Sequence, residues 1–298
     1  MTEHSTQPAT QHLGVDGGTL AYELTGPTSP SAPLVVLAHG MGDDRRAYRF
    51  LAPALAASGY RVVAVDLRGA GESSTGWPSY SRTDIAGDLV ALVEHLGGPA
   101  VLVGHSIAGG AVTIAAATAP HLVTAVVELA PFTRKQSFSL GDLRSTPYRR
   151  GATHLAGTLL GSEKSWARYL DVAYPATKPA DHDARLAEIM AMLAEPGRMK
   201  ALQAMFKSAP TDADAQLPHV RCPVLVIQGG ADPDWADPRA EGEGIVAALP
   251  AGLGRLELVP GSGHYPHVQH PTEVLELVLP FLATVAPATT GAESGDRA

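Results

Sequence analysis

The chain has 298 residues, of which 45% are hydrophobic, and it carries a formal net charge of −8. This length suits one large α/β domain, or one domain with an insertion, and the composition is ordinary for a protein that buries a sizeable core. The acidic balance argues against nucleic-acid binding.

A single cysteine, Cys222, excludes an intrachain disulfide. Residues 1–11 are polar and lack the apolar centre of a signal peptide, and no apolar stretch reaches the roughly 18 residues that span a bilayer. These features predict a cytoplasmic protein with no membrane partner, and they leave its oligomeric state open.

Apolar runs separated by helical patterns follow one another along the chain. We expect residues 1–12 and 286–298 to be disordered, and residues 15–24 to form a hairpin that turns at Asp16-Gly17-Gly18. The predicted strands lie at 34–38, 62–65, 100–103, 122–129, 224–228 and 256–259. The predicted helices lie at 47–58, 85–96, 111–118, 239–249 and 272–282. Continuous apolar strands between helices indicate an α/β fold, with a mostly parallel, doubly wound sheet.

The alternation stops between residues 132 and 217. This segment contains helical stretches at 166–174, 184–194 and 199–206 but no convincing core strand. We interpret it as a helical cap inserted between two sheet strands. The sheet-bearing core then comprises residues 13–131 and 218–285.

The hexapeptide Gly104-His105-Ser106-Ile107-Ala108-Gly109 joins a predicted strand to a predicted helix. A serine on a sharp strand-to-helix turn, flanked by small residues, is typical of a nucleophile elbow. Such a turn holds the serine in a sparsely populated backbone conformation, which exposes its hydroxyl. Ala108 departs from the glycine usual at the fifth position, but it is still small.

A nucleophilic serine requires a base and a carboxylate that orients the base. Asp232 and His264 each follow a predicted strand, and the carboxyl ends of parallel strands meet at one edge of a sheet. We therefore predict that Ser106, His264 and Asp232 act together. The amides of Met41 and Ile107 are the predicted oxyanion donors, since Met41 lies in a glycine-containing loop directly after a strand.

The chain resembles the cap-bearing branch of the α/β-hydrolase superfamily over about residues 15–285. The resemblance rests on five segments: His39-Gly40-Met41-Gly42, Asp66-Leu67-Arg68-Gly69-Ala70-Gly71-Glu72-Ser73, the hexapeptide, Gly229-Gly230-Ala231-Asp232 and Gly263-His264-Tyr265-Pro266. It implies the hydrolase fold and a serine nucleophile. It says little about the substrate, because this fold serves many reactions.

Other residues compete for these roles. Asp234 and Asp237 share the loop of Asp232, and Glu128 ends a strand near the site. We interpret His39 and His105 as packing or loop-ordering residues, and Asp43 and Asp44 as caps of the following helix. Pro266 and Pro271 make a helix across His264, His267 and His270 improbable, which argues against a shared zinc site. We expect neither a metal nor an organic cofactor.

We hypothesise a serine hydrolase that cleaves a carboxylic ester of a small, fairly apolar, uncharged substrate through an acyl-enzyme. Among the aromatic and methionine residues of the predicted cap, those expected to line the acyl pocket are Phe132, Phe138, Trp166 and Met190. Alternatives are another acyl bond (thioester, lactone, amide or the carbon–carbon bond of a diketone), or a small-molecule receptor of the same fold. Epoxide hydrolase chemistry is disfavoured, because such relatives use an aspartate where this chain has Ser106.

Overall fold

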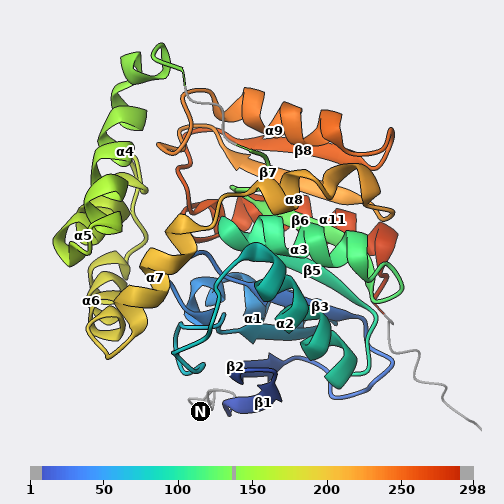
Figure 1. The fold of residues 1–298 in the computed structure, drawn as a ribbon. Helices are drawn as coiled ribbons and strands as arrows, with labels where there is room; N and C mark the ends of the chain where they lie inside the picture. The colour runs from blue at the N-terminus through green and yellow to red at the C-terminus, as the bar shows by residue number, and fades with distance from the viewer. Residues whose placement is uncertain (1–8, 136–138, 289–298) are drawn as a thin grey trace, which may run out of the picture.

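The computed structural model describes residues 9–135 and 139–288. Their central element is an eight-stranded sheet in the order β1-β2-β4-β3-β5-β6-β7-β8 (Figure 1). The strands are β1 (Gln11–Val15), β2 (Gly18–Thr25), β3 (Leu34–Ala38), β4 (Arg61–Val65), β5 (Ala100–His105), β6 (Val123–Leu129), β7 (Val224–Gly229) and β8 (Gly254–Val259). The strands from β4 to β8 are parallel, and the β1–β2 hairpin joins antiparallel to β4. The predicted fold class is confirmed.

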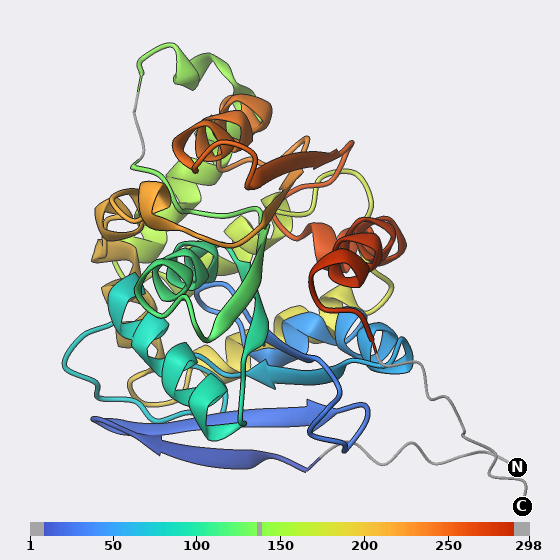
Figure 2. The ribbon, with the colours of Figure 1, turned by 90° about the vertical axis from the view of Figure 1, so that its right-hand side faces the viewer.

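Helices cover both faces of the sheet, because the central strands are apolar on both sides (Figure 2). On one face lie α1 (Leu51–Ala57) and α11 (Pro271–Val285), whose buried side chains share a cluster with Val35 and Val103. On the other lie α2 (Arg82–His95), α3 (Ile107–Thr118) and α9 (Pro238–Ala248), packed with Val36 and Leu102.

The chain between β6 and β7 is helical, and the described residues there form no strand. Its main helices, α4 to α7, lie together on one side of the molecule (Figure 1). The elements are η2 (Asp142–Arg144), α4 (Thr146–Leu159), α5 (Glu163–Val172), α6 (His182–Leu193), α7 (Arg198–Lys207), α8 (Thr211–Asp214) and η3 (Leu217–His219). We call this stretch the inserted helices.

Several local predictions are wrong. Strand β1 begins at Gln11, inside the expected disordered lead-in, because it pairs with β2. The first predicted helix is divided into η1 (Arg45–Tyr48) and α1, and Phe50 between them is 37% exposed. The sequence does not predict helix α4, because few of its residues are large and apolar and only Gly151 and Thr158 are buried. A single turn, α10 (Pro266–Gln269), forms because proline suits the first helical position.

Candidate active site

Ser106 occupies the turn between β5 and α3, with φ 55° and ψ −118°. This left-handed conformation is strained for a residue with a side chain, and the neighbouring residues hold it in place. The Ser106 N–H donates to Leu129 of β6 at 3.0 Å, and the Ser106 carbonyl accepts from Phe132 N–H at 3.0 Å. A Cβ atom at Gly104 would lie 2.3 Å from the Ala108 carbonyl oxygen, so this position of the motif admits only glycine.

His264 follows β8 and is buried, and its Nδ1 lies 2.9 Å from Asp232 Oδ2. Asp232 is held from two sides: Asp234 N–H donates to its Oδ1 at 3.0 Å, and the Gln228 side chain approaches its Oδ2 at 3.4 Å. Since a carboxylate only accepts, His264 Nδ1 carries the proton and Nε2 is left as the basic nitrogen. The structure therefore brings the predicted acid and base together.

A second carboxylate also contacts His264. Asp234 Oδ2 lies 3.2 Å from Nδ1, and the Tyr169 hydroxyl of α5 donates to the same oxygen at 2.6 Å. Burial, and then the charge of Asp232 against the opposing effect of His264, raise the pKa of Asp234 to about 6. The sequence alone makes Asp234 a competitor of Asp232, whereas the structure places both carboxylates at one imidazole nitrogen.

The two carboxylates control the protonation of His264. Burial disfavours the imidazolium, but the charges of Asp232 and Asp234 and the hydrogen bond from Asp232 outweigh it and raise the pKa of His264 to about 9. Among the described residues, these three side chains are also the only group of acids and histidines close enough to share an ion. Their hydrogen bonds account for the arrangement.

The Met41 and Ile107 amides are available as donors. In the described part of the chain, neither N–H donates to another protein group. His39 orders the Met41 loop, because its Nδ1 donates to the Gly40 carbonyl at 2.7 Å and its Nε2 accepts from Leu67 N–H at 3.0 Å. His105 Nε2 donates to the His264 carbonyl at 2.7 Å. Both histidines thus bind the backbone of the predicted site loops.

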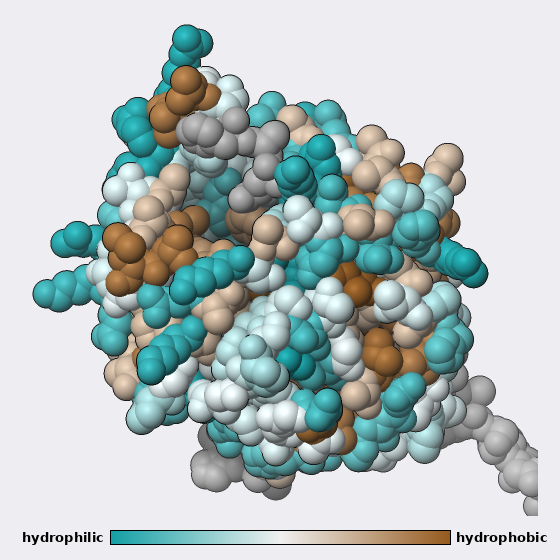
Figure 3. All heavy atoms as spheres, in the orientation of Figure 1, coloured by the Kyte–Doolittle hydropathy of each residue, from teal (hydrophilic) through white to brown (hydrophobic). Residues whose placement is uncertain are grey.

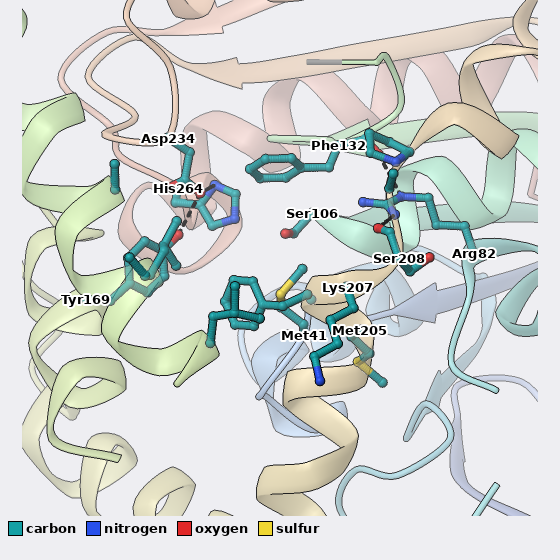
Figure 4. A pocket seen from close by; sticks show the side chains of 18 of the residues that line it. Met41, Arg82, Ser106, Phe132, Tyr169, Met205, Lys207, Ser208, Asp234 and His264 are labelled. Atoms are coloured by element: carbon teal, nitrogen blue, oxygen red, sulfur yellow. Dashed lines mark hydrogen bonds and ion pairs between the residues drawn. The ribbon is translucent and has the colours of Figure 1, made fainter. Parts of the chain in front are cut away.

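These loops open on a cavity of about 550 Å³ (Figure 4). Ser106 and His264 line it, and Figure 4 shows the serine hydroxyl directed into it. The two side chains make no hydrogen bond with each other within the described residues, and such contacts are often long before a substrate binds. Phe132 lies above Ser106 in this view, and Met41 lies below.

The four predicted pocket residues have different outcomes. Phe132 and Trp166 line the cavity. Met190 does not: it packs against the hydrophobic cluster of the inserted helices, because its position on α6 faces that cluster. Phe138 lies outside the described residues.

The surface next to the cavity is apolar. Figure 3 shows hydrophobic residues gathered over α4 and the neighbouring end of α5. Among the described residues, four of the five exposed large hydrophobic side chains belong to the segment between β6 and β7: Leu140, Leu143, Leu159 and Leu160. Leu155 and Leu159 also line the cavity, so apolar surface continues from the exterior towards Ser106.

Three other acidic residues near the site have other partners. Glu128 Oε1 accepts hydrogen bonds from Thr113 and from Thr133 at 2.8 Å, which places this carboxyl away from His264. Asp44 caps η1 as expected by accepting from Arg46 N–H at 2.9 Å. Asp43 instead accepts from Arg185 of α6, a long-range partner that local patterns do not reveal.

The fold and the site define an open-sheet α/β protein in which a strained serine and a carboxylate-bound histidine line one cavity. A family model described as "alpha/beta hydrolase fold" matches residues 33–271. The chain belongs to this family.

Known proteins agree with this placement. A serine hydrolase-like protein of Dictyostelium discoideum is 33% identical over 119 residues, which are 39% of this chain and 33% of that protein. Epoxide hydrolase B of Mycobacterium tuberculosis is 42% identical over 82 residues, 26% of this chain and 23% of its own length. The crystal structure of an esterase from Rhodococcus sp. matches with a TM-score of 0.75 and 24% identity, covering 94% of this chain and 100% of that one.

The first curated relatives are therefore matched over at most about a third of their length. The structural match shows the fold. In the described residues, no helix combines the length and the apolar character needed to cross a bilayer.

Proposed function

We propose that the protein is a serine hydrolase that cleaves a carboxylic ester through an acyl-enzyme. The observation that carries the proposal is the common cavity of Ser106 and His264, with His264 Nδ1 bound to Asp232 at 2.9 Å. The positions, tautomer and burial of these groups suit nucleophilic attack by an activated hydroxyl.

In the proposed reaction, His264 Nε2 accepts the proton of Ser106 as the oxygen attacks the ester carbonyl. The Met41 and Ile107 amides stabilise the resulting oxyanion, a contribution whose loss typically costs about 10²–10³ in rate per donor. The imidazolium then donates its proton to the departing alcohol. Water, deprotonated by His264, releases the acid.

The inserted helices act in this proposal as a cap over the site. Trp166 of α5 lies so close to Gly42 that a Cβ atom there would approach its indole ring to 2.6 Å, and Gly42 has φ +70°. Tyr169, one turn further along α5, reaches Asp234. The cap thus contacts both the loop of Met41 and the carboxylates, and its apolar residues suit an ester that is apolar next to the reacting carbonyl.

Labelling with a fluorophosphonate, followed by intact-mass measurement, tests the proposal. We expect one adduct on the native protein, none on Ser106→Ala, and turnover of neutral acyl esters by the native protein only. Labelling that persists in Ser106→Ala would contradict the assignment. Tight binding of small apolar ligands without labelling or turnover would favour a receptor instead.

A further inference from the structure

Arg82 is a buried cation in the cavity, and it has no carboxylate partner among residues 9–135 and 139–288. It is the first residue of α2 and is 2% exposed. Its Nε donates to the Phe132 carbonyl at 2.9 Å, and its Nη1 donates to the Ser208 carbonyl at 2.7 Å. Asp212 is the acid whose charge acts on the pKa of Arg82, but its carboxylate accepts hydrogen bonds from the Thr83 N–H and hydroxyl instead. Among the described residues, no carboxylate forms an ion pair with this guanidinium, and the charge of Asp212 acts on it only from a distance.

Such an arrangement is costly unless a ligand completes it. A buried charge is normally paired, and carbonyl oxygens satisfy two of the five donors of an arginine without neutralising it. Burial lowers the pKa of Arg82 to about 10, which still leaves it charged at neutral pH. The remaining N–H groups, on Nη1 and Nη2, can bind the two oxygens of one carboxylate.

The guanidinium lies close to the reacting serine. Arg82 and Ser106 line the same cavity, and in Figure 4 Ser106 lies between Arg82 and His264, with a guanidinium nitrogen directed towards the interior. Two hydrogen bonds through the Phe132 backbone also connect them: Arg82 donates to the Phe132 carbonyl, and the Phe132 N–H donates to the Ser106 carbonyl.

The positions of the two groups orient an ester. His264 must protonate the departing alcohol, so the alcohol part lies on the His264 side of the reacting carbonyl. The acyl part then extends to the opposite side, where Arg82 lies. An anionic group that reaches Arg82 therefore belongs to the acid, not to the alcohol.

We propose that Arg82 binds a free carboxylate at the far end of the acyl chain, so that the preferred substrates are monoesters of dicarboxylic acids. The proposal rests on the proposed esterase function and replaces the expectation of an uncharged substrate. That expectation was based on the site loops, whereas Arg82 comes from helix α2. The reaction balances as half-ester plus water giving dicarboxylic acid and alcohol, the acyl–oxygen bond being broken.

Paired substrates test it. Ethyl hydrogen glutarate and ethyl pentanoate differ in carrying a carboxylate or a methyl group at the chain end, and a pH-stat follows both hydrolyses at pH 7.5. We expect the native kcat/KM to favour the half-ester, and this preference to fall about tenfold or more in Arg82→Met, as for loss of a charge-assisted hydrogen bond. Arg82→Lys is expected to retain part of the preference.

Arg61→Met is the matched control, because Arg61 also donates to a backbone carbonyl, that of Leu96, but lies outside the cavity. It should leave the preference unchanged. Equal kcat/KM for the two native substrates, or the same preference in Arg82→Met as in the native protein, would overturn the inference while leaving esterase function intact. Absence of both hydrolyses together with absence of fluorophosphonate labelling would instead reject the proposed function.

Discussion

Asp234 places its Oδ2 3.2 Å from His264 Nδ1, on the ring nitrogen that Asp232 contacts at 2.9 Å. The two carboxylates differ in their remaining partners. Asp232 is held by a backbone N–H and by Gln228, and Asp234 accepts the Tyr169 hydroxyl. Asp232 therefore orients His264, and Asp234, which is bound by Tyr169 of α5, further stabilises the protonated form of His264.

Exchange of each carboxylate for an amide separates these roles. We expect Asp232→Asn to lower kcat/KM for a neutral ester by about 10³–10⁴, because an amide nitrogen beside Nδ1 favours the wrong imidazole tautomer. Asp234→Asn should lose less than about tenfold, since an amide oxygen still accepts from Tyr169. The comparison is made by steady-state kinetics at a pH on the plateau of the activity profile, where His264 is neutral. A larger loss in Asp234→Asn than in Asp232→Asn would reverse the assignment.

The pH dependence of kcat/KM should report the raised pKa of His264. Only the neutral imidazole accepts the Ser106 proton, so kcat/KM should rise along an acid limb centred near the His264 pKa of about 9 and level off above it. Removal of one negative charge in Asp234→Asn makes the imidazolium less favourable, which lowers the pKa and moves the limb to lower pH. A native limb centred at the ordinary histidine value of about 6.5, unmoved by Asp234→Asn, would contradict this account.

The tight turn around Ser106 predicts that alanine at Gly104 is destabilising, whereas alanine at an unconstrained glycine is not. Gly104→Ala would place a methyl carbon 2.3 Å from a backbone oxygen, so we expect the free energy of unfolding to fall by about 1–3 kcal/mol, together with a loss of kcat. Gly87→Ala is the control: it lies in α2 with open space around its Cβ position, and it should gain about 0.5–1 kcal/mol. Urea denaturation measures both. Equal stabilities for the two variants would show that the turn tolerates a side chain.

Much of this architecture could be predicted from the sequence, because the signals are local. Ser106 follows an apolar strand, and Asp232 and His264 follow others, so the parallel sheet alone brings them to one edge. The sequence does not predict helix α4, because this helix has few large apolar residues and buries only Gly151 and Thr158. The hydrogen-bond partners of Arg82 and Asp234 could not be predicted from the sequence. These partners are Ser208 and Tyr169, which lie far away in the chain.

The contact between α6 and the Met41 loop is another long-range feature, and it predicts a large effect on stability. Arg185 donates to Asp43 and, at 2.7 Å, to Asp44, and all three side chains are buried. Arg185→Met leaves two buried carboxylates without this partner, which should cost about 3–5 kcal/mol. Arg239→Met removes an exposed arginine 3.9 Å from Glu243 and should change stability by no more than about 0.5 kcal/mol. Similar melting temperatures for the two variants would contradict a stabilising role for Arg185.

Trapping the acyl-enzyme tests the central claim most directly. The native protein is mixed with 4-nitrophenyl butyrate, quenched in acid within the first turnover, and analysed by intact mass and peptide mapping. The account predicts one butyryl group on the peptide that contains Ser106, and none in Ser106→Ala. Hydrolysis by the native protein without an acyl group on Ser106, or with the acyl group on another residue, would contradict it.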